Sequence, residues 1–296
     1  MTESVTETKE FIIYSHLPSH VRSELRTLSG RESKVVLGLE AQGREVLSLD
    51  DISSLAEVSP AHARKLAERL AAKGWIQRVG RGKYLLNPPK AGPDAIPDTN
   101  AYRIGSRLVT PYYFGYATAA TYHGLLSQAS RTYFVVTTSP HAPKISEPAE
   151  FRIVRVPPRK FFGITEAEKS GASILVADVE KTVVDAVDRP DYVGGISSVA
   201  QIISNAKPRL DAAKLVEYTT RMRSKSLAQR LGYLLDHVPP HGFQPRARAA
   251  LLRLRGDAFV SLASPKQYPR RGRYVSEWRV VLNVPESDLM GEVNIG

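Results

Sequence analysis

Residues 59–86, SPAHARKLAERLAAKGWIQRVGRGKYLL, decide how the first third of the chain folds. Ser59 is a favourable helix N-cap, and proline suits the next position because the first helical N–H has no intrahelical partner. The residues that follow carry one apolar stripe at the helical period, comprising Ala63, Leu66, Ala67, Leu70 and Ala71. Gly74 is typical of the position just after a helix. The pattern predicts a helix that begins after Ser59 and runs to about Lys73.

A β-hairpin is predicted directly after this helix. The segments 75–79 and 83–86 are rich in apolar and β-forming residues, and they flank the turn Gly80-Arg81-Gly82. Because glycine adopts the backbone conformations that tight turns require, Arg81 is expected at the exposed tip of the hairpin.

Two shorter helices are predicted before Ser59. Residues 31–42 place three apolar side chains on one face: Val35, Val36 and Leu39. Ser48, with Asp51 three residues later, has the spacing of a capping box and begins a helix through Ile52, Leu55 and Ala56. Helices followed by a capped helix and a hairpin are typical of a winged helix-turn-helix, whose recognition helix enters the major groove of duplex DNA.

The predicted fold class is therefore α+β, with an N-terminal winged helix-turn-helix domain followed by a larger mixed α/β domain. We assign residues 1–88 to the DNA-binding domain, with a helical extension at 18–28. Residues 89–97 contain Pro89, Pro93 and Pro97 and are expected to form a Pro-rich linker. Residues 98–296 form the second domain, in which apolar runs such as 132–138 predict strands and 179–187 predicts a helix.

The polar face of the predicted recognition helix supplies the expected contacts to DNA. Small residues at its start let the helix approach base edges, and the basic residues farther along can reach guanine or phosphate. The hairpin adds basic side chains that would follow the DNA backbone or enter a minor groove. The predicted DNA-binding residues are Ser59, His62, Arg64, Lys65, Arg69, Lys73, Arg78, Arg81 and Lys83. A module of this shape that binds only protein is the alternative.

The charge of the chain is concentrated in two regions. The whole chain has a net charge of +11 and a pI near 9.8. Residues 59–90 hold eight bases and one acid, and the basic region 201–280 holds sixteen bases and five acids. Clustered Lys and Arg indicate a polyanionic partner, and a solvated basic face is the alternative. A second basic surface is predicted from Arg221, Arg223, Arg246, Arg248, Arg270, Arg271 and Arg273.

The composition also argues against several classes of protein. There are no cysteines, so disulfides, thiolate metal sites and cysteine nucleophiles are excluded, which fits a reducing cytosol. No run of 18 apolar residues occurs, and residues 1–10 are polar and acidic, unlike a signal peptide. We expect a cytoplasmic protein with no membrane partner. The seven histidines are scattered without metal-site spacing, so no metal and no cofactor are predicted.

Asp178, Glu180, Lys181 and Asp185 are the strongest candidates for catalysis. Carboxylates with a lysine after a strand can hold Mg²⁺ in nucleases and phosphoryl-transfer enzymes. The structural interpretation is favoured: Asp178 caps a helix and Glu180 lies at its positive end. The apolar side chains that pack inward are Val179, Val183, Val184 and Val187. His123 is likewise expected to be a hydrogen-bonded residue at a helix end rather than a general base. No catalytic residue is predicted.

Three segments resemble a known family. Residues 73–84, KGWIQRVGRGKY, look like the wing of the AbiEi-type antitoxins of type IV toxin–antitoxin systems. Residues 119–125, AATYHGL, and residues 178–185, DVEKTVVD, resemble two motifs of the antitoxin C-terminal domain, and Gly194-Gly195 resembles its glycine pair. The resemblance spans about residues 31–205 and does not extend to the N-terminal helix or the basic region.

The resemblance implies a transcriptional autorepressor that binds inverted repeats in operator DNA and counteracts a nucleotidyltransferase-type toxin. The toxin would be a functional partner, and the resemblance leaves open whether it is bound directly. The basic region would then face the toxin, its RNA substrate or the DNA that flanks the operator. The alternative function is a nucleic-acid-processing enzyme, a nuclease or nucleotidyl-transfer protein, that uses the winged helix to bind its substrate.

Overall fold

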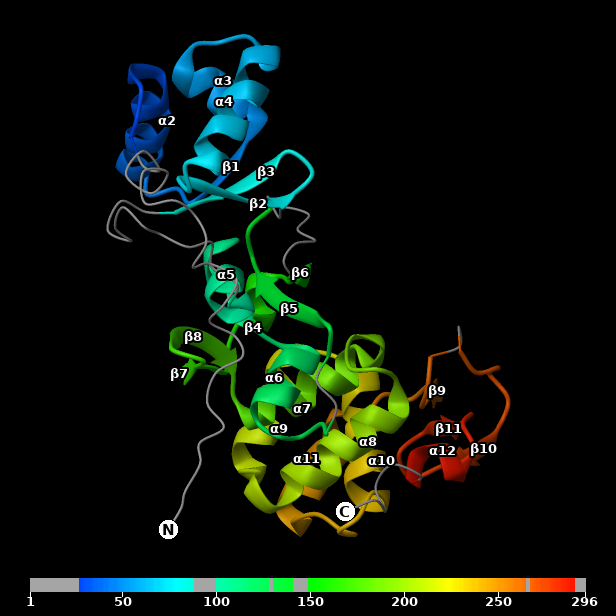
Figure 1. Cartoon of the computed structure of the whole chain (residues 1–296). Coiled ribbons are helices and arrows are strands. Elements are labelled where there is room, and N and C mark those ends of the chain that lie inside the picture. The colour runs from blue at the N-terminus through cyan, green and yellow to red at the C-terminus, as the bar shows by residue number, and fades with distance from the viewer. Residues whose placement is uncertain (1–26, 88–99, 128–129, 141–148, 265–266, 291–296) are drawn as a thin grey trace, which may run out of the picture. The chain divides into compact units, whose positions relative to one another are not determined.

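The computed structural model describes residues 27–87, 100–127, 130–140, 149–264 and 267–290 (Figure 1). The chain divides into two compact units, Met1–Thr99 and Asn100–Gly296, each of which is described by itself below. The linker predicted at 89–97 lies outside the described residues. So does the helical extension predicted at 18–28, except for Thr27 and Leu28, which are not helical.

The first unit has the predicted order of helices and hairpin, with one additional strand. Its elements are α2 (Gly30–Ala41), β1 (Val46–Ser48), α3 (Leu49–Ala56), α4 (Pro60–Ala72), β2 (Ile76–Gly80) and β3 (Lys83–Leu86). Both α2 and α3 begin with capping boxes, formed by Ser29 with Glu32 and by Ser48 with Asp51. Because each box satisfies exposed backbone N–H groups at a helix start, these short helices are fixed in place.

The strands of the first unit form an antiparallel sheet in the order β1-β3-β2. β1 was not predicted, and it pairs Leu47 with Tyr84 across the sheet. The apolar stripes of all three helices meet in one core, which is closed by Trp75 and Ile76 at the start of the hairpin. The chain leaves α4 through Gly74 at a φ of 71°, with Trp75 N–H donating to the Leu70 carbonyl at 2.8 Å. This arrangement is a Schellman motif, which sets the direction of the hairpin relative to α4.

A five-stranded mixed sheet in the order β6-β5-β4-β8-β7 organises the second unit. Its strands are β4 (Tyr113–Phe114), β5 (Thr132–Thr137), β6 (Glu150–Arg155), β7 (Ile164–Lys169) and β8 (Ala172–Ala177). β4 lies at the centre, parallel to β8 and antiparallel to β5. Two short helices accompany the sheet, α5 (Ala101–Arg107) and α6 (Tyr116–Tyr122).

The rest of the second unit is mainly helical. Its helices are α7 (Val179–Asp188), α8 (Ile196–Ala206), α9 (Ala212–Met222), α10 (Lys225–His237), α11 (Pro245–Leu254) and α12 (Glu286–Met290). α7 is the central one, in contact with α6, α8, α9 and α10. A small sheet of β9 (Val260–Ser261), β10 (Arg273–Val275) and β11 (Val280–Leu282) packs on α10. Among the described residues, no helix is long and apolar enough to cross a membrane.

The predicted fold class is confirmed: an N-terminal winged helix precedes a larger domain that mixes helix and strand.

Candidate nucleic-acid interface

The outer face of α4 is open to solvent along its length. The exposed side chains there include His62, Arg64, Lys65 and Arg69. The apolar stripe on the opposite face is fully buried and comprises Ala63, Leu66, Ala67 and Leu70. Glu68 is the one acidic residue of this helix. The outer face is therefore a basic ridge on a rigidly packed helix, as a major-groove contact requires.

The start of α4 differs from the expected cap. Ser59 occupies the N-cap position, but its hydroxyl lies 2.8 Å from His62 Nδ1 and makes no hydrogen bond to a backbone amide of the helix. The first turn of α4 therefore has no side-chain cap. Amides at a helix start, together with the helix dipole, attract anions such as phosphate.

Two of the predicted DNA contacts also stabilise the domain. Lys73 Nζ lies 2.8 Å from Glu32 Oε2, and Arg69 Nε lies 3.4 Å from Glu32 Oε1. Burial raises the pKa of Glu32, but the hydrogen bonds from Lys73 and Ser29 and the Lys73 charge outweigh it, and the pKa falls to about 2. Lys73 is 28% exposed and Arg69 57% exposed, so the guanidinium of Arg69 is the more accessible of the two.

The hairpin presents its basic residues at one end. Arg81 is exposed at the turn, and Gly82 after it has a φ of 64°, which only glycine adopts readily. Arg78 is exposed and its Nε donates to the Gly80 carbonyl at 3.3 Å, beside an irregularity in the pairing of the two strands. Lys83 is half-buried. Arg81 is thus an exposed basic side chain at the tip of the hairpin, where it can reach DNA.

The residues of the predicted second basic surface are distributed over three segments. Arg221 and Arg223 lie at the end of α9, Arg246 and Arg248 lie at the start of α11, and the others precede or begin β10. Arg248 pairs with Asp236 at 2.8 Å and with Glu277 at 2.5 Å, so its charge is used in contacts within the second unit. Arg221 lies over the Phe162 ring at 4.2 Å and is exposed.

The four residues considered for catalysis are held in structural contacts. Asp178 caps α7 through the Lys181 amide at 2.8 Å, as predicted, and it also accepts from the Tyr218 hydroxyl at 2.9 Å. Glu180 is 5% exposed and accepts from the Asp211 amide. Lys214 Nζ lies 3.1 Å from Asp178 and 3.0 Å from Glu180, and therefore joins the two carboxylates.

Lys181 and Asp185 form a separate pair inside the unit. The two side chains are completely or almost completely buried, and the ammonium donates to the carboxylate one helical turn away. Burial raises the pKa of Asp185, while the charge and hydrogen bond of Lys181 oppose that rise. Within the described segments, no three His, Asp or Glu side chains lie where they could hold one metal ion.

His123 ends α6, and its Nε2 lies 2.7 Å from the Ala177 carbonyl. Burial lowers the pKa of His123, although this hydrogen bond opposes the change. The predicted role as a hydrogen-bonded residue at a helix end is therefore confirmed.

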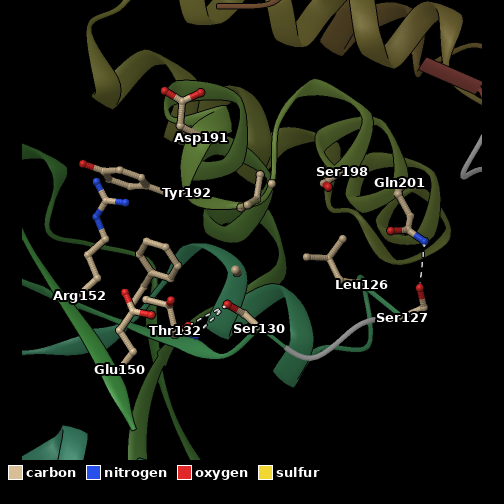
Figure 2. A pocket seen from close by; sticks show the side chains of 14 residues that line it. Leu126, Ser127, Ser130, Thr132, Glu150, Arg152, Asp191, Tyr192, Ser198 and Gln201 are labelled. Carbon is tan, nitrogen blue, oxygen red and sulfur yellow. Dashed lines mark hydrogen bonds between the residues drawn. The ribbon is translucent and has the colours of Figure 1, made fainter. Parts of the chain in front are cut away.

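A cavity of about 900 Å³ in the second unit was not predicted (Figure 2). It lies between β5, β6 and α8. Arg152 lies 4.3 Å above the Tyr192 ring at one side, and Ser198 and Gln201 line the other. Glu150 and Asp191 also line it, so its charges are mixed. Gly194, which belongs to the glycine pair noted in the sequence, also lines the cavity and has a φ of 100° before α8.

Two family models match the chain. The model described as "Transcriptional regulator, AbiEi antitoxin" matches residues 35–87, and "AbiEi antitoxin C-terminal domain" matches residues 113–237. The chain belongs to the AbiEi antitoxins. The resemblance noted in the sequence is thus confirmed for both units.

The fold of this AbiEi antitoxin is similar to that of the RV2827C protein from Mycobacterium tuberculosis, whose crystal structure has been determined. The TM-score is 0.53 at 18% sequence identity, and the match covers 90% of this chain and 96% of the other. At this identity the similarity concerns the fold alone. No curated protein matches the chain at a significant level.

Proposed function

We propose that this AbiEi antitoxin is a transcriptional autorepressor that binds duplex DNA through α4 and the β2–β3 hairpin. The observation that carries the proposal is the exposed basic ridge of His62, Arg64 and Lys65 on a helix whose opposite face is fully buried. Such a helix can enter a major groove without losing any packing contact. Arg81 would lie along the adjacent backbone or in a minor groove.

The second unit would supply the antitoxin activity, without catalysis. The candidate carboxylates of α7 are occupied by a helix cap, by Lys214 and by Tyr218, and these contacts account for them structurally. We infer that the toxin belongs to the nucleotidyltransferase class that accompanies AbiEi antitoxins, and that the operator is an inverted repeat in the promoter region of the antitoxin gene.

A reporter assay tests the regulatory part of this proposal. The promoter region of the gene drives a reporter in cells that express wild-type protein or the Lys65→Ala, Arg81→Ala variant. Wild type should repress the reporter, and the variant should not. Glu40→Gln serves as the matched control because Glu40 is exposed on α2, away from the proposed interface. Equal repression by wild type and variant would contradict the assignment of α4 and the hairpin.

A growth assay tests the antitoxin part separately. The neighbouring toxin gene is expressed from an independent promoter together with wild-type protein or the same double variant. Both should restore growth if the second unit counteracts the toxin. Failure of the variant to restore growth would show that the antitoxin activity requires DNA binding.

A further inference from the structure

The small sheet of the second unit carries an exposed pair of aromatic side chains. Tyr274 on β10 is 64% exposed and Phe259 just before β9 is 43% exposed. Their ring centroids lie 5.0 Å apart with an interplanar angle of 72°. Large exposed apolar side chains are common singly, but two in contact form an apolar patch, and such patches mark interaction sites.

The register of the sheet places both rings on its outer face. Tyr274 pairs with Val281 of β11, which in turn pairs with Ser261 of β9, and because directly paired residues point to the same face of a sheet, Tyr274 and Ser261 share one face. Because side chains alternate along a strand, Phe259, two residues before Ser261, lies on the same face. The β9–β11 sheet therefore has one face against α10 and one face that carries the aromatic pair.

Packing against α10 makes this sheet a rigid support. Trp278 is fully buried and its ring lies so close to Gly232 that a side chain there would collide with it. Trp278 Nε1 donates to Asp236 at 2.8 Å, and Gln229 Nε2 donates to the carbonyls of Ala258 and Arg279 at 2.8 and 3.0 Å. These hydrogen bonds fix the backbone around Phe259 in the absence of a bound partner.

The charges around the aromatic pair favour an anionic partner. Arg270, Arg271 and Arg273 lead into β10 and are exposed. The exposed acids of this region are already paired: Asp257 with Arg279, at 3.2 Å, and Glu277 with Arg248. Aromatic rings beside arginines on a sheet are the combination that binds single-stranded nucleic acid, because bases stack on the rings and the phosphates meet the guanidinium groups.

We propose that the outer face of the β9–β11 sheet binds single-stranded RNA, with bases stacked on Tyr274 and Phe259 and the backbone held by Arg270 and Arg271. The hydroxyls of Tyr274 and Ser261 on this face offer partners for a ribose 2′-hydroxyl, which favours RNA over DNA. This surface lies on the second unit and is independent of the proposed duplex-binding face of α4.

Fluorescence anisotropy with the full-length protein tests the proposal. The probe is a labelled oligouridylate of about 12 nucleotides, long enough to cover a small binding site. Tyr274→Ala and Phe259→Ala should each weaken binding by about fivefold or more, as expected when one stacked base is lost. Tyr274→Phe should keep most of the affinity. Arg270→Ala with Arg271→Ala should make the salt dependence shallower by about 0.7 for each lost phosphate contact.

Two controls make the result specific. Leu37→Ala removes an apolar side chain of α2 that is 56% exposed, and it should leave RNA affinity unchanged. Lys65→Ala with Arg81→Ala should weaken duplex DNA binding but not RNA binding.

Equal affinity of wild type and both aromatic-to-alanine variants, with unchanged melting temperatures, would overturn the proposal. So would tighter binding of the oligodeoxyuridylate, or of a duplex, at the β9–β11 face.

Discussion

Helices α4 and α7 are both dense in charged residues, but the structure uses the charges in opposite ways. In α4 the residues His62, Arg64 and Lys65 are exposed. In α7 the residues Lys181 and Asp185 are 0% and 2% exposed. Both helices begin at a favourable N-cap residue and carry an apolar stripe, so their sequences differ little in kind.

The difference shows that surroundings, more than residue type, separate a binding face from a structural network. A buried charge is costly unless a partner and hydrogen bonds compensate it, so the charged residues of α7 are fixed by the fold. A charge on the outer face of α4 remains solvated and is free to meet a phosphate or a base edge.

Removing Lys181 should have the largest effect on stability. Lys181→Ala would leave the buried Asp185 carboxylate without its ammonium partner, although the Tyr113 hydroxyl still donates to it at 3.3 Å, and breaking a buried ion pair in this way typically costs about 3–5 kcal/mol. Thermal unfolding of the second unit should shift down strongly, while duplex DNA binding by folded protein should be unchanged. The double variant Lys181→Met, Asp185→Leu should recover much of the loss because it removes both charges. If Lys181→Ala were no less stable than wild type, the pair would not be structural.

Glu32 links α2 to the basic end of α4, and its contribution should depend on pH. Its pKa of about 2, below the ordinary value of 4.5, means that the carboxylate stabilises the folded state fully above pH 4.5. This contribution is lost as the pH falls towards 2. Glu32→Gln should therefore lower stability at neutral pH by about 2–3 kcal/mol, and much less near pH 2.

Thermal melts of the two proteins at pH 7 and pH 2.5 check this prediction, with Glu40→Gln on the same helix as the control. A loss of equal size at both pH values would contradict the assigned role of the Lys73 and Arg69 contacts to Glu32.

Changing the outer face of α4 should alter sequence preference and leave stability unchanged. His62→Ala or Lys65→Ala should shift the preference for operator over altered operators by about 1–3 kcal/mol for each affected base pair. Binding to a panel of single-base operator variants measures the shift. An equal loss of affinity for operator and random DNA would place these side chains on the backbone.

The smallest effect is expected from Asp178, one of the four residues considered for catalysis. Asp178→Asn keeps the cap geometry and the Tyr218 contact and loses mainly one ion pair with Lys214, which is 37% exposed. Such a pair contributes about 1 kcal/mol or less. Growth rescue in the presence of the toxin should be retained. A complete loss of rescue by a stably folded Asp178→Asn variant would favour the enzymatic alternative.

Most of the first unit could be predicted from its sequence because its signals are local. The apolar period of α4, the capping boxes and the glycines of the hairpin each act within a few residues. β1 was missed because three residues are too few for a pattern, and its position is fixed only by pairing with β3. In the second unit β4, with two residues, was missed for the same reason, whereas β7 was missed because its six residues are mostly polar and exposed.

The proposed DNA-binding residues could be predicted where their exposure follows from a local sequence pattern, such as the apolar period of α4. The outer position of His62 and Lys65 follows from the buried stripe, and the exposed tip at Arg81 follows from its glycines. The contact of Arg69 and Lys73 with Glu32 could not be foreseen, because Arg69 is 37 positions and Lys73 is 41 positions from Glu32 in the sequence. The cavity beside α8 and the exposed Phe259–Tyr274 pair likewise result from tertiary packing.

Salt-dependent binding to the promoter DNA of the gene tests whether α4 and the β2–β3 hairpin bind duplex DNA. Anisotropy titrations of full-length wild type and Arg81→Ala are made with the same duplex at several salt concentrations. For wild type, log K should fall steeply with log salt, with a slope of about −0.9 for each phosphate contact, and Arg81→Ala should reduce the slope by about one contact or change the base preference. A wild-type affinity that does not depend on salt, or one that Arg81→Ala and Lys65→Ala leave unchanged, would contradict the account.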